Sequence, residues 1–366
     1  MKAVVIGGTG FVGMNVTRAL VAAGHDVVAT RKVHANTLFA RKLGAPLVRA
    51  DLDDEPALCE AMRGREVAFM CAGHYPRYSL EPQVEIDVAR ARVCRALSAA
   101  RKARVSRVVL TSSIATVGPP RHGERSTEDD PIEPRSLESV YHRVKLAIEE
   151  ETLASGLDVV VLLPTGIVGE LDVKAGTGFL FVALGNGLLP FFVEGRTNVI
   201  DADDLARAHV AAALHGKSGE RYAVGGHDLM VSELLERVAE ILGVPMTAQP
   251  VPWWLAGPAA TFAEMRAAAI KDGGRPFLAR EMVDVVRFGR FVDSSKAARE
   301  LSLSPPTPLD DTLRKACGWF VKHRYIRLPS RVSEGVQGVD HAPRPDRTDR
   351  ARPRDDYPPP EAGAHR

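Results

Sequence analysis

The chain has 366 residues, which is long for one domain of ordinary size, so one large domain or two fused units are expected. Apolar residues make up 45% of it and charged residues 26%, as in soluble globular proteins, and this composition argues against a fibrous or membrane-embedded chain. The 48 Lys and Arg residues nearly balance the 46 Asp and Glu residues, so we expect no basic surface for nucleic acid.

Short apolar runs alternate with helix-length segments, most clearly in the first half of the chain. Each run is rich in Val, Leu or Ile, as strands buried on both faces of a sheet are. The alternation predicts βαβ units, and therefore an α/β fold of the Rossmann type with a doubly wound parallel sheet. The predicted strands are 2–6, 26–30, 46–48, 67–70, 105–110, 157–163 and 221–224, and the predicted helices include 13–23, 85–100, 141–155, 203–214 and 232–242.

The first predicted strand is joined to the first helix by a glycine-rich turn, Gly7-Gly8-Thr9-Gly10-Phe11-Val12-Gly13. Its glycines let the backbone turn tightly and approach a pyrophosphate, and the helix N-terminus adds free N–H groups and the positive end of its dipole. The spacing alone is a weak signal, but its place between a strand and a helix predicts a dinucleotide site. The expected contacts are Gly7, Thr9, Gly10, Phe11, Val12 and Gly13.

Two cations, Arg31 and Lys32, follow the second predicted strand, where an NAD site would carry a carboxylate for the ribose 2′-hydroxyl. A guanidinium and an ammonium suit the extra 2′-phosphate of NADP, so NADP(H) is the expected cofactor and NAD(H) the alternative. A solvated surface pair is the other interpretation of these cations. Asp51 and Leu52 follow the third predicted strand, where the carboxylate could accept from the adenine amino group.

Hydroxyl and ammonium groups converge on the carboxyl edge of the predicted sheet. Tyr141 and Lys145 stand four residues apart on a predicted helix, so they share one face. Thr111, Ser112 and Ser113 end the fifth strand, and open α/β sheets bind ligands beyond the carboxyl ends of their strands. This grouping predicts a catalytic site there.

The loop after the fourth predicted strand faces the same edge and holds His74, Tyr75 and Tyr78. These are candidate substrate contacts, with a plain surface loop as the alternative. The four cysteines show neither a Cys-x-x-Cys pair nor a His cluster at metal-ligand spacing. We therefore predict no metal site and reduced thiols in a cytoplasmic protein; no export signal is visible.

Through these motifs the chain resembles the extended short-chain dehydrogenase/reductase family, also called the NAD-dependent epimerase/dehydratase family, over about residues 1–328. Within it, the chain looks most like the dihydroflavonol-reductase-like group, especially the hopanoid-associated sugar epimerase-like proteins, through residues 219–226 and 318–320. The family motifs are the glycine turn 7–13, Asp51-Leu52, residues 111–116, Tyr141-x-x-x-Lys145, and residues 164–169 and 201–206.

The resemblance implies a role for each site residue. Tyr141 would be the general acid or base, its pKa lowered from about 10 by the Lys145 ammonium and the nicotinamide charge. Lys145 would also hold the nicotinamide ribose, and Ser113, rather than Ser112, would donate to the substrate oxygen. The other cofactor contacts implied are Thr111, then Pro164, Thr165, Gly166 and Ile167 beside the nicotinamide, and Ala72 and Gly73 beside the adenosine.

Two residues near these motifs need separate expectations. Asp87 stands where the family usually carries an Asn in the helix before the fifth strand, so a positioning role is not carried over to it. His142 follows the catalytic tyrosine, and we expect a half-exposed helix residue rather than a second base.

The expected domains are a dinucleotide-binding domain over 1–168, to which 196–226 returns, and a smaller substrate-binding lobe from 169–195 and 227–328. The uncharged stretches 175–193 and 250–262 are too broken by Gly and Pro for membrane spans, although Trp253 and Trp254 are compatible with peripheral membrane contact. Residues 329–366 are rich in Pro and charge and poor in large apolar side chains, which predicts a disordered tail.

The expected function is interconversion of a carbonyl and a secondary alcohol on a small, partly apolar molecule by NADP(H)-dependent hydride transfer. The first alternative is an NAD-dependent sugar or nucleotide-sugar epimerase. The second is a non-catalytic, NAD(P)-sensing binding protein. A homodimer through the helices that flank the fifth strand is common in the family and is an expectation here.

Overall fold

The computed structural model describes residues 1–74, 79, 81–269 and 279–328. Its main feature is a seven-stranded sheet in the order β11-β7-β5-β4-β1-β2-β3, with every pair of neighbours parallel. This confirms the predicted parallel α/β fold. The strands are β1 Lys2–Ile6, β2 Asp26–Arg31, β3 Leu47–Arg49, β4 Val67–Met70, β5 Arg107–Thr111, β7 Val159–Pro164 and β11 Arg221–Val224.

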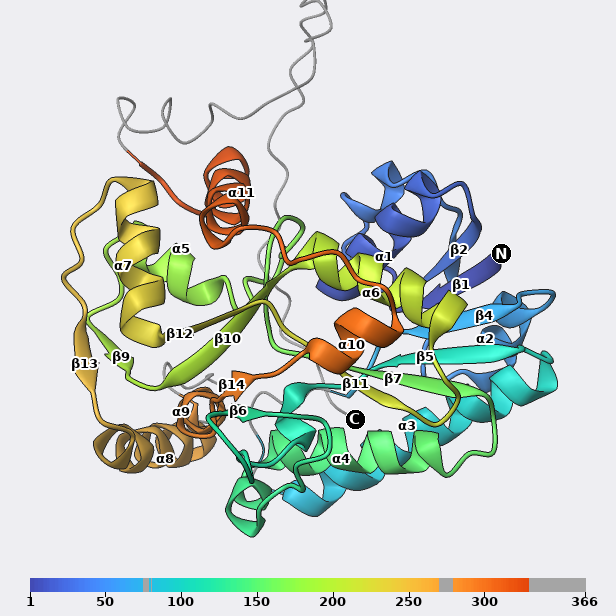
Figure 1. Ribbon diagram of the computed structural model, residues 1–366, viewed down its shortest axis with the longest axis horizontal. Helices are drawn as coiled ribbons and strands as arrows, with labels where there is room; N and C mark the ends of the chain where they lie inside the picture. The colour runs from blue at the N-terminus through green and yellow to red at the C-terminus, as the bar shows by residue number, and fades with distance from the viewer. Residues whose placement is uncertain (75–78, 80, 270–278, 329–366) are drawn as a thin grey trace, which may run out of the picture.

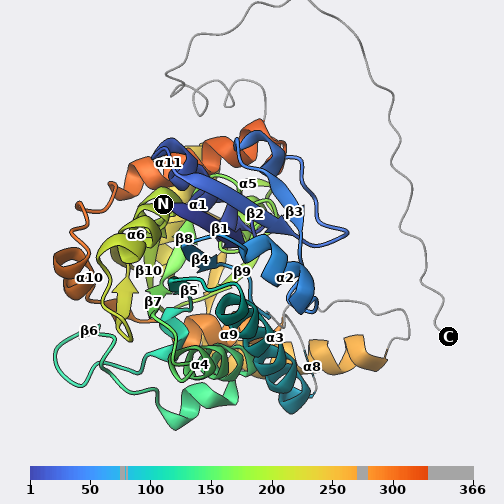
Figure 2. The ribbon, with the colours of Figure 1, turned by 90° about the vertical axis from the view of Figure 1, so that its right-hand side faces the viewer.

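Successive residues of each central strand enter two different cores. Val4 and Ile6 pack with helices on one face, while Ala3 and Val5 pack on the other. Because strand side chains alternate between faces, this explains why the central strands are almost continuously apolar. Helices α2 (Glu55–Met62), α3 (Pro82–Lys102) and α4 (Val140–Leu153) cover the first face, and α1 (Phe11–Ala22) and α6 (Ala202–His215) cover the second (Figure 2).

A second region, on the left in Figure 1, is built around a three-stranded sheet. Strand β10 (Arg196–Asp201) pairs in parallel with β8 (Gly166–Val168) and antiparallel with β12 (His227–Met230). A separate hydrophobic core joins this sheet to α5 (Phe179–Gly185), α7 (Val231–Leu242) and α11 (Leu309–Lys322). The chain passes from the large sheet to this one through a single residue, Thr165.

Two further pairs of short strands occur among the described residues, the first between the two regions and the second within the second region. β6 (Arg125–Ser126) pairs with β14 (Phe291–Val292), and β9 (Phe191–Val193) pairs with β13 (Gln249–Val251). Helices α8 (Trp253–Ala269) and α9 (Arg280–Arg287) pack together at the lower left of Figure 1, and α10 (Ser295–Glu300) lies beside β11. Among the described helices, none is long and apolar enough to cross a membrane.

Two predicted strands begin two residues later in the structure than the apolar runs that suggested them. Val105 donates its N–H to the Ala100 carbonyl, after a left-handed turn at Arg104, so it closes the end of α3 and β5 starts at Arg107. β7 likewise starts at Val159, because Gly156 turns the chain after α4. The predicted tail at 329–366 lies outside the described residues, as do Tyr75 and Tyr78.

Candidate active site

The glycine turn between β1 and α1 leaves no room for side chains at its crowded positions. A Cβ at Gly13 would lie 2.2 Å from the Gly7 carbonyl oxygen, and one at Gly7 would lie 2.8 Å from the Cβ of Ala72. Gly7 also has a positive φ of 88°, and its N–H donates to Thr30 Oγ1 at 3.0 Å. Helix α1 then starts at Phe11 without a side-chain cap, so its first turn is suited to an external anion.

The ends of β2 and β3 place the predicted adenosine contacts side by side. Asp51 Oδ1 is buried without a hydrogen-bond partner, and Lys32 Nζ lies 3.8 Å from it. Leu52 is buried next to it. Arg31 ends β2 and donates through Nη1 to the carbonyls of Lys32 and Val33, at 3.2 Å each. The cations and the unsatisfied carboxylate oxygen thus share one edge of the sheet.

The three predicted catalytic residues come together between β5 and α4. The hydroxyl of Tyr141 donates to Ser113 Oγ at 3.1 Å. One turn further along α4, Lys145 Nζ donates to the carbonyl oxygen of Ser112 at 3.4 Å. The strand end supplies the serine and the helix supplies the phenol and the ammonium, as the convergence in the sequence predicted.

Burial dominates the electrostatics of this cluster. Protein atoms surround the Tyr141 hydroxyl and raise its pKa to about 12; the hydrogen bond with Ser113 opposes this rise and the negative charge of Glu281 adds to it. Burial also lowers the pKa of Lys145 to about 8. Burial thus raises the pKa of the phenol in the chain by itself. The lowering by Lys145 together with the nicotinamide charge, which the resemblance implies, stays a prediction for the site with cofactor bound.

The residues predicted to contact the nicotinamide join the large sheet to the small one. Pro164 ends β7, and Gly166 and Ile167 begin β8. Between them, Thr165 buries its Oγ1 without a hydrogen-bond partner.

Thr111 was predicted as a cofactor contact, but its hydroxyl is directed to His209 on α6. Its Oγ1 lies 2.7 Å from Nε2 of His209 on α6, on the face of the sheet opposite α4. His209 Nδ1 in turn lies 2.8 Å from the Leu205 carbonyl oxygen. The structure therefore does not bring the Thr111 hydroxyl to Tyr141 and Ser113.

Three further predictions near the site have different outcomes. His74 contacts Glu85 through Nε2 and Arg92 Nη1 through Nδ1 at 2.9 Å, so both ring nitrogens are engaged by α3. Tyr75, the neighbouring candidate, lies outside the described residues. Asp87 is exposed and accepts from Gln83 Nε2 at 2.8 Å, one turn earlier on α3.

His142 is buried, so the expectation of a half-exposed residue is wrong. Its ring packs edge-on against Tyr141 and against Phe288, with centroids 5.8 and 5.4 Å away. Phe288 follows α9, and the sequence pattern of α4 alone could not predict that a residue from α9 covers His142. Burial, with the nearby Arg290 guanidinium, lowers the pKa of His142 to about 4.

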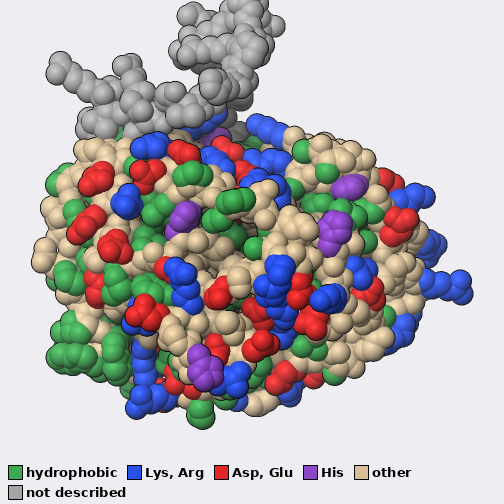
Figure 3. All heavy atoms as spheres, in the orientation of Figure 1, with side chains coloured by type: hydrophobic (Ala, Val, Ile, Leu, Met, Phe, Trp, Pro, Cys, Tyr) green, Lys and Arg blue, Asp and Glu red, His purple; other side chains and the backbone are tan. Residues whose placement is uncertain are grey.

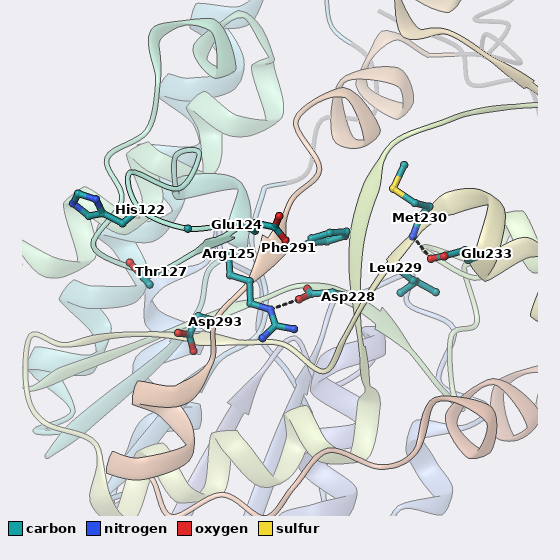
Figure 4. Close-up of a pocket in the computed structure, with 11 residues that line it drawn as sticks. His122, Glu124, Arg125, Thr127, Asp228, Leu229, Met230, Glu233, Phe291 and Asp293 are labelled. Atoms are coloured by element: carbon teal, nitrogen blue, oxygen red, sulfur yellow. Dashed lines mark hydrogen bonds and ion pairs between the residues drawn. The ribbon is translucent and has the colours of Figure 1, made fainter.

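An open hollow of about 760 Å³ lies on another part of the surface, between β6, β12 and β14 (Figure 4). Arg125 crosses it to form an ion pair with Asp228 at 2.6 Å. Its lining contains none of the predicted site residues. The lining consists of His122, Gly123, Glu124, Arg125, Thr127, Asp228, Leu229, Met230, Glu233, Phe291 and Asp293.

The residues around the glycine turn fit a dinucleotide. A crowded glycine cradle leads into a helix N-terminus, and two buried oxygens of the predicted site, Asp51 Oδ1 and Thr165 Oγ1, have no hydrogen-bond partner. The model of the NAD dependent epimerase/dehydratase family matches residues 3–225, more than half of the chain. The chain belongs to this family. It is an enzyme of the extended short-chain dehydrogenase/reductase type, which catalyses NAD-dependent oxidoreduction or epimerisation.

The similar proteins include one named as a reductase and one named as an epimerase, and each aligns with the chain over nearly its whole length. The chain is 30% identical over 332 residues to a putative dihydroflavonol 4-reductase of Synechocystis sp., covering 88% of this chain and 95% of the relative. It is 28% identical over 324 residues to sterol demethylase protein B of Methylococcus capsulatus, with 87% and 98% covered. Among solved structures, a nucleoside-diphosphate-sugar epimerase from Pseudomonas aeruginosa is similar with a TM-score of 0.75 and 30% identity, over 89% of this chain and 99% of that one.

Proposed function

We propose that this protein is a reductase or dehydrogenase that interconverts a carbonyl and a secondary alcohol. The observation that carries the proposal is the contact of the Tyr141 hydroxyl with Ser113 Oγ at 3.1 Å, with Lys145 one turn away on the same helix. A carbonyl oxygen placed between the two hydroxyls would accept a hydrogen bond from each. When bound, the nicotinamide supplies or accepts the hydride.

Each of the three side chains has a distinct part in this reaction. Ser113 stabilises the negative charge that grows on the substrate oxygen during reduction. Tyr141, whose pKa of about 12 keeps it protonated, gives its proton to that oxygen. Lys145 is positively charged below its pKa of about 8, so near neutral pH it favours the phenolate left behind. In the oxidation direction, Tyr141 takes the proton back.

Residues of the large sheet would hold the cofactor, and we propose that it is NADP(H) rather than NAD(H). Arg31 and Lys32 stand at the end of β2, and the Arg31 guanidinium contacts only backbone carbonyls in the described structure, so it can turn to a 2′-phosphate. Tight binding of NADPH over NADH, with the preference lost in Arg31→Ala, is the expected result of fluorescence titrations. Equal affinities that Arg31→Ala does not change would contradict it.

We propose the predicted division of labour between the regions: residues 1–168 and 196–226 bind the cofactor, and 169–195 and 227–328 bind the substrate. The packing of the second region against the catalytic helix supports this. The charge of Glu281 on α9 acts on Tyr141, and Phe288 packs on His142.

The substrate that we propose is at least partly apolar. Helix α8, beside α9, exposes Trp254, Leu255 and Phe262, and Figure 3 shows hydrophobic side chains gathered at the lower left, where α8 lies in Figure 1. The name of the Methylococcus relative, a sterol demethylase component, agrees with an apolar substrate. The same surface would also suit peripheral contact with a membrane. The four cysteines are all free, which suits a reducing compartment such as the cytoplasm.

An epimerase is the second candidate, because the Pseudomonas structure named as a nucleoside-diphosphate-sugar epimerase is 30% identical over nearly the whole chain. Deuterium labelling separates the two functions. A reductase transfers deuterium from C4 of labelled NADPH to the carbinol carbon of the product, with net cofactor oxidation. An epimerase changes the configuration of its substrate with no net oxidation, and retains NAD that mass spectrometry detects after denaturation.

A dinucleotide-sensing protein without catalysis is the remaining alternative. It predicts cofactor binding without turnover of any carbonyl, alcohol or sugar in such a screen. Homodimerisation through α3 and α4, the helices that flank β5, is a further proposal, which light scattering of the purified protein tests directly.

A further inference from the structure

One face of α4 contacts the loop after β5 at three successive turns. Tyr141, Lys145 and Glu149 are spaced four residues apart, so their side chains lie in one row along the helix. Tyr141 contacts the Ser113 side chain, and Lys145 contacts the Ser112 carbonyl. Glu149 accepts from Ser112 Oγ at 2.5 Å. The two adjacent serines are thus bonded at opposite ends of the row, which spans about 12 Å along a helix.

The carboxylate of Glu149 is the most heavily bonded group in this row. Its residue is only 3% exposed. Oε2 accepts from Thr116 Oγ1 at 2.8 Å as well as from Ser112, and Oε1 forms an ion pair with Arg221 Nε at 2.6 Å. Arg221, in β11, also donates through Nη2 to the Thr116 carbonyl at 3.3 Å. A buried carboxylate requires partners of this kind, and here the loop after β5 and strand β11 provide them.

Ser112 and Thr116 lie on either side of Ser113, and Glu149 holds both. With the Ser112 hydroxyl directed to Glu149, Ser113 is the serine whose hydroxyl meets Tyr141. We propose that Glu149 is a positioning residue that fixes the loop 112–116 against α4, so that Ser113 Oγ faces the Tyr141 hydroxyl. This inference rests on the proposed function and names a residue on which the alignment of that reaction depends.

The negative charge of Glu149 also acts on the next group in the row. Glu149 from α4 and the Cys71 thiol after β4 both raise the pKa of Lys145, against the larger effect of burial. Ser112 faces the ammonium with its carbonyl oxygen. Loss of the Glu149 charge therefore moves the deprotonation of Lys145 to lower pH, a change that loosened packing alone does not predict.

A double-mutant cycle of Glu149→Gln and Ser112→Ala tests the proposal on any accepted substrate. Each single variant is expected to lower kcat by about 10- to 100-fold, because a displacement of about 1 Å can cost this much, while the KM for the cofactor changes little. If Glu149 acts through Ser112, the double variant loses no more than the worse single variant. In Glu149→Gln the alkaline limb of the kcat profile also moves to lower pH.

Glu128→Gln is the matched control, since Glu128 is also 3% exposed and its side chain pairs with Lys296 Nζ at 3.3 Å, while Arg221 contacts only its backbone carbonyl. This variant is expected to lower the melting temperature while leaving kcat within about twofold, because the Glu128–Lys296 pair is buried but lies outside the reaction centre. Should Glu149→Gln not fold, Ser112→Ala and Thr116→Val test the same contacts without removing a charge.

Full activity in Ser112→Ala, or losses that multiply in the double variant, would overturn the role of Glu149. Failure of the proposed function has a different signature, because turnover would then survive Tyr141→Phe whatever the cycle shows. If the losses in kcat multiply in the double variant while Tyr141→Phe is inactive, only the positioning role of Glu149 is rejected.

Discussion

The groups between β5 and α4 and the surface of α8 differ in what they bury. At the catalytic edge, polar and charged side chains are buried and bonded: Ser112 and Glu149 are each 3% exposed and bonded to one another. On α8 the arrangement is reversed. The helix turns small residues such as Ala256 and Ala260 inward and leaves Phe262 69% exposed.

This difference indicates which part of the enzyme tolerates substitutions. Buried hydrogen-bonded groups are strongly interdependent, since removal of one partner leaves another unsatisfied. Among the described residues, the cluster of buried apolar side chains under α8 consists of Ala256, Ala260 and Val283, so substitutions on its outer face meet few neighbours. We therefore propose that the chemistry resides in the tightly bonded region and the choice of substrate in the loosely packed one.

The largest effect expected is on the catalytic side. Tyr141→Phe removes the proton donor and should lower kcat by about 10²- to 10⁴-fold, with little change in melting temperature. Tyr222→Phe is a suitable control, because Tyr222 is also a bonded tyrosine, with its hydroxyl 3.2 Å from Glu300, but lies away from Ser113. Steady-state kinetics of both variants check this, and equal activities would refute the assignment of Tyr141.

The glycine cradle should be the next most sensitive part. Gly13→Ala places a Cβ 2.2 Å from the Gly7 carbonyl oxygen, so the turn must shift. Overpacking of this kind costs about 1–3 kcal/mol, and the distorted turn should also bind NADPH more weakly. Urea denaturation and cofactor titration measure the two effects. Unchanged cofactor affinity would mean that the turn does not hold the pyrophosphate.

The buried histidines should make stability depend on pH. Burial lowers the pKa of His209 to about 4, below its value of about 6.5 in an unfolded chain. The unfolded state therefore binds an extra proton between these values, and the free energy of unfolding falls as pH falls from 6.5 towards 4. The slope is about 1.4 kcal/mol per pH unit for each histidine. Urea titrations at pH 7, 6 and 5 should show a smaller slope in His209→Gln, and an identical slope would be contrary to this account.

The smallest effect is expected on α8. Phe262→Ala should change the free energy of unfolding by no more than about 0.5 kcal/mol, because the side chain is largely exposed. Phe69→Ala in β4, where Phe69 is fully buried, should cost about 3–5 kcal/mol and serves as the comparison. A large loss in Phe262→Ala would show that the outer face of α8 is covered, and would sharpen the search for what covers it.

Local sequence signals were enough for the parallel sheet and the meeting of Ser113, Tyr141 and Lys145. Strand hydrophobicity, the glycine turn and helical spacing are properties of neighbouring residues, and a parallel sheet brings strand ends together. Glu149 and Glu281 could not be recognised in this way, because both act with distant segments. Glu149 pairs with Arg221 of β11, and Glu281 on α9 acts on Tyr141 of α4. The one available signal was the spacing of Glu149, four residues beyond Lys145. His142 was misjudged for the same reason, since Phe288 covers it.

The pairing of Glu149 with Arg221 also bears on the order in which the enzyme becomes functional during synthesis. β5, α4 and β7 leave the ribosome before β11. Until Arg221 joins the sheet, the Glu149 carboxylate lacks its only ion-pair partner among the described residues. A chain that ends before β11 would bury an uncompensated charge beneath its catalytic loop, which is strongly unfavourable. If Glu149 positions the catalytic loop as proposed, the reacting groups reach their alignment only once the sheet is complete.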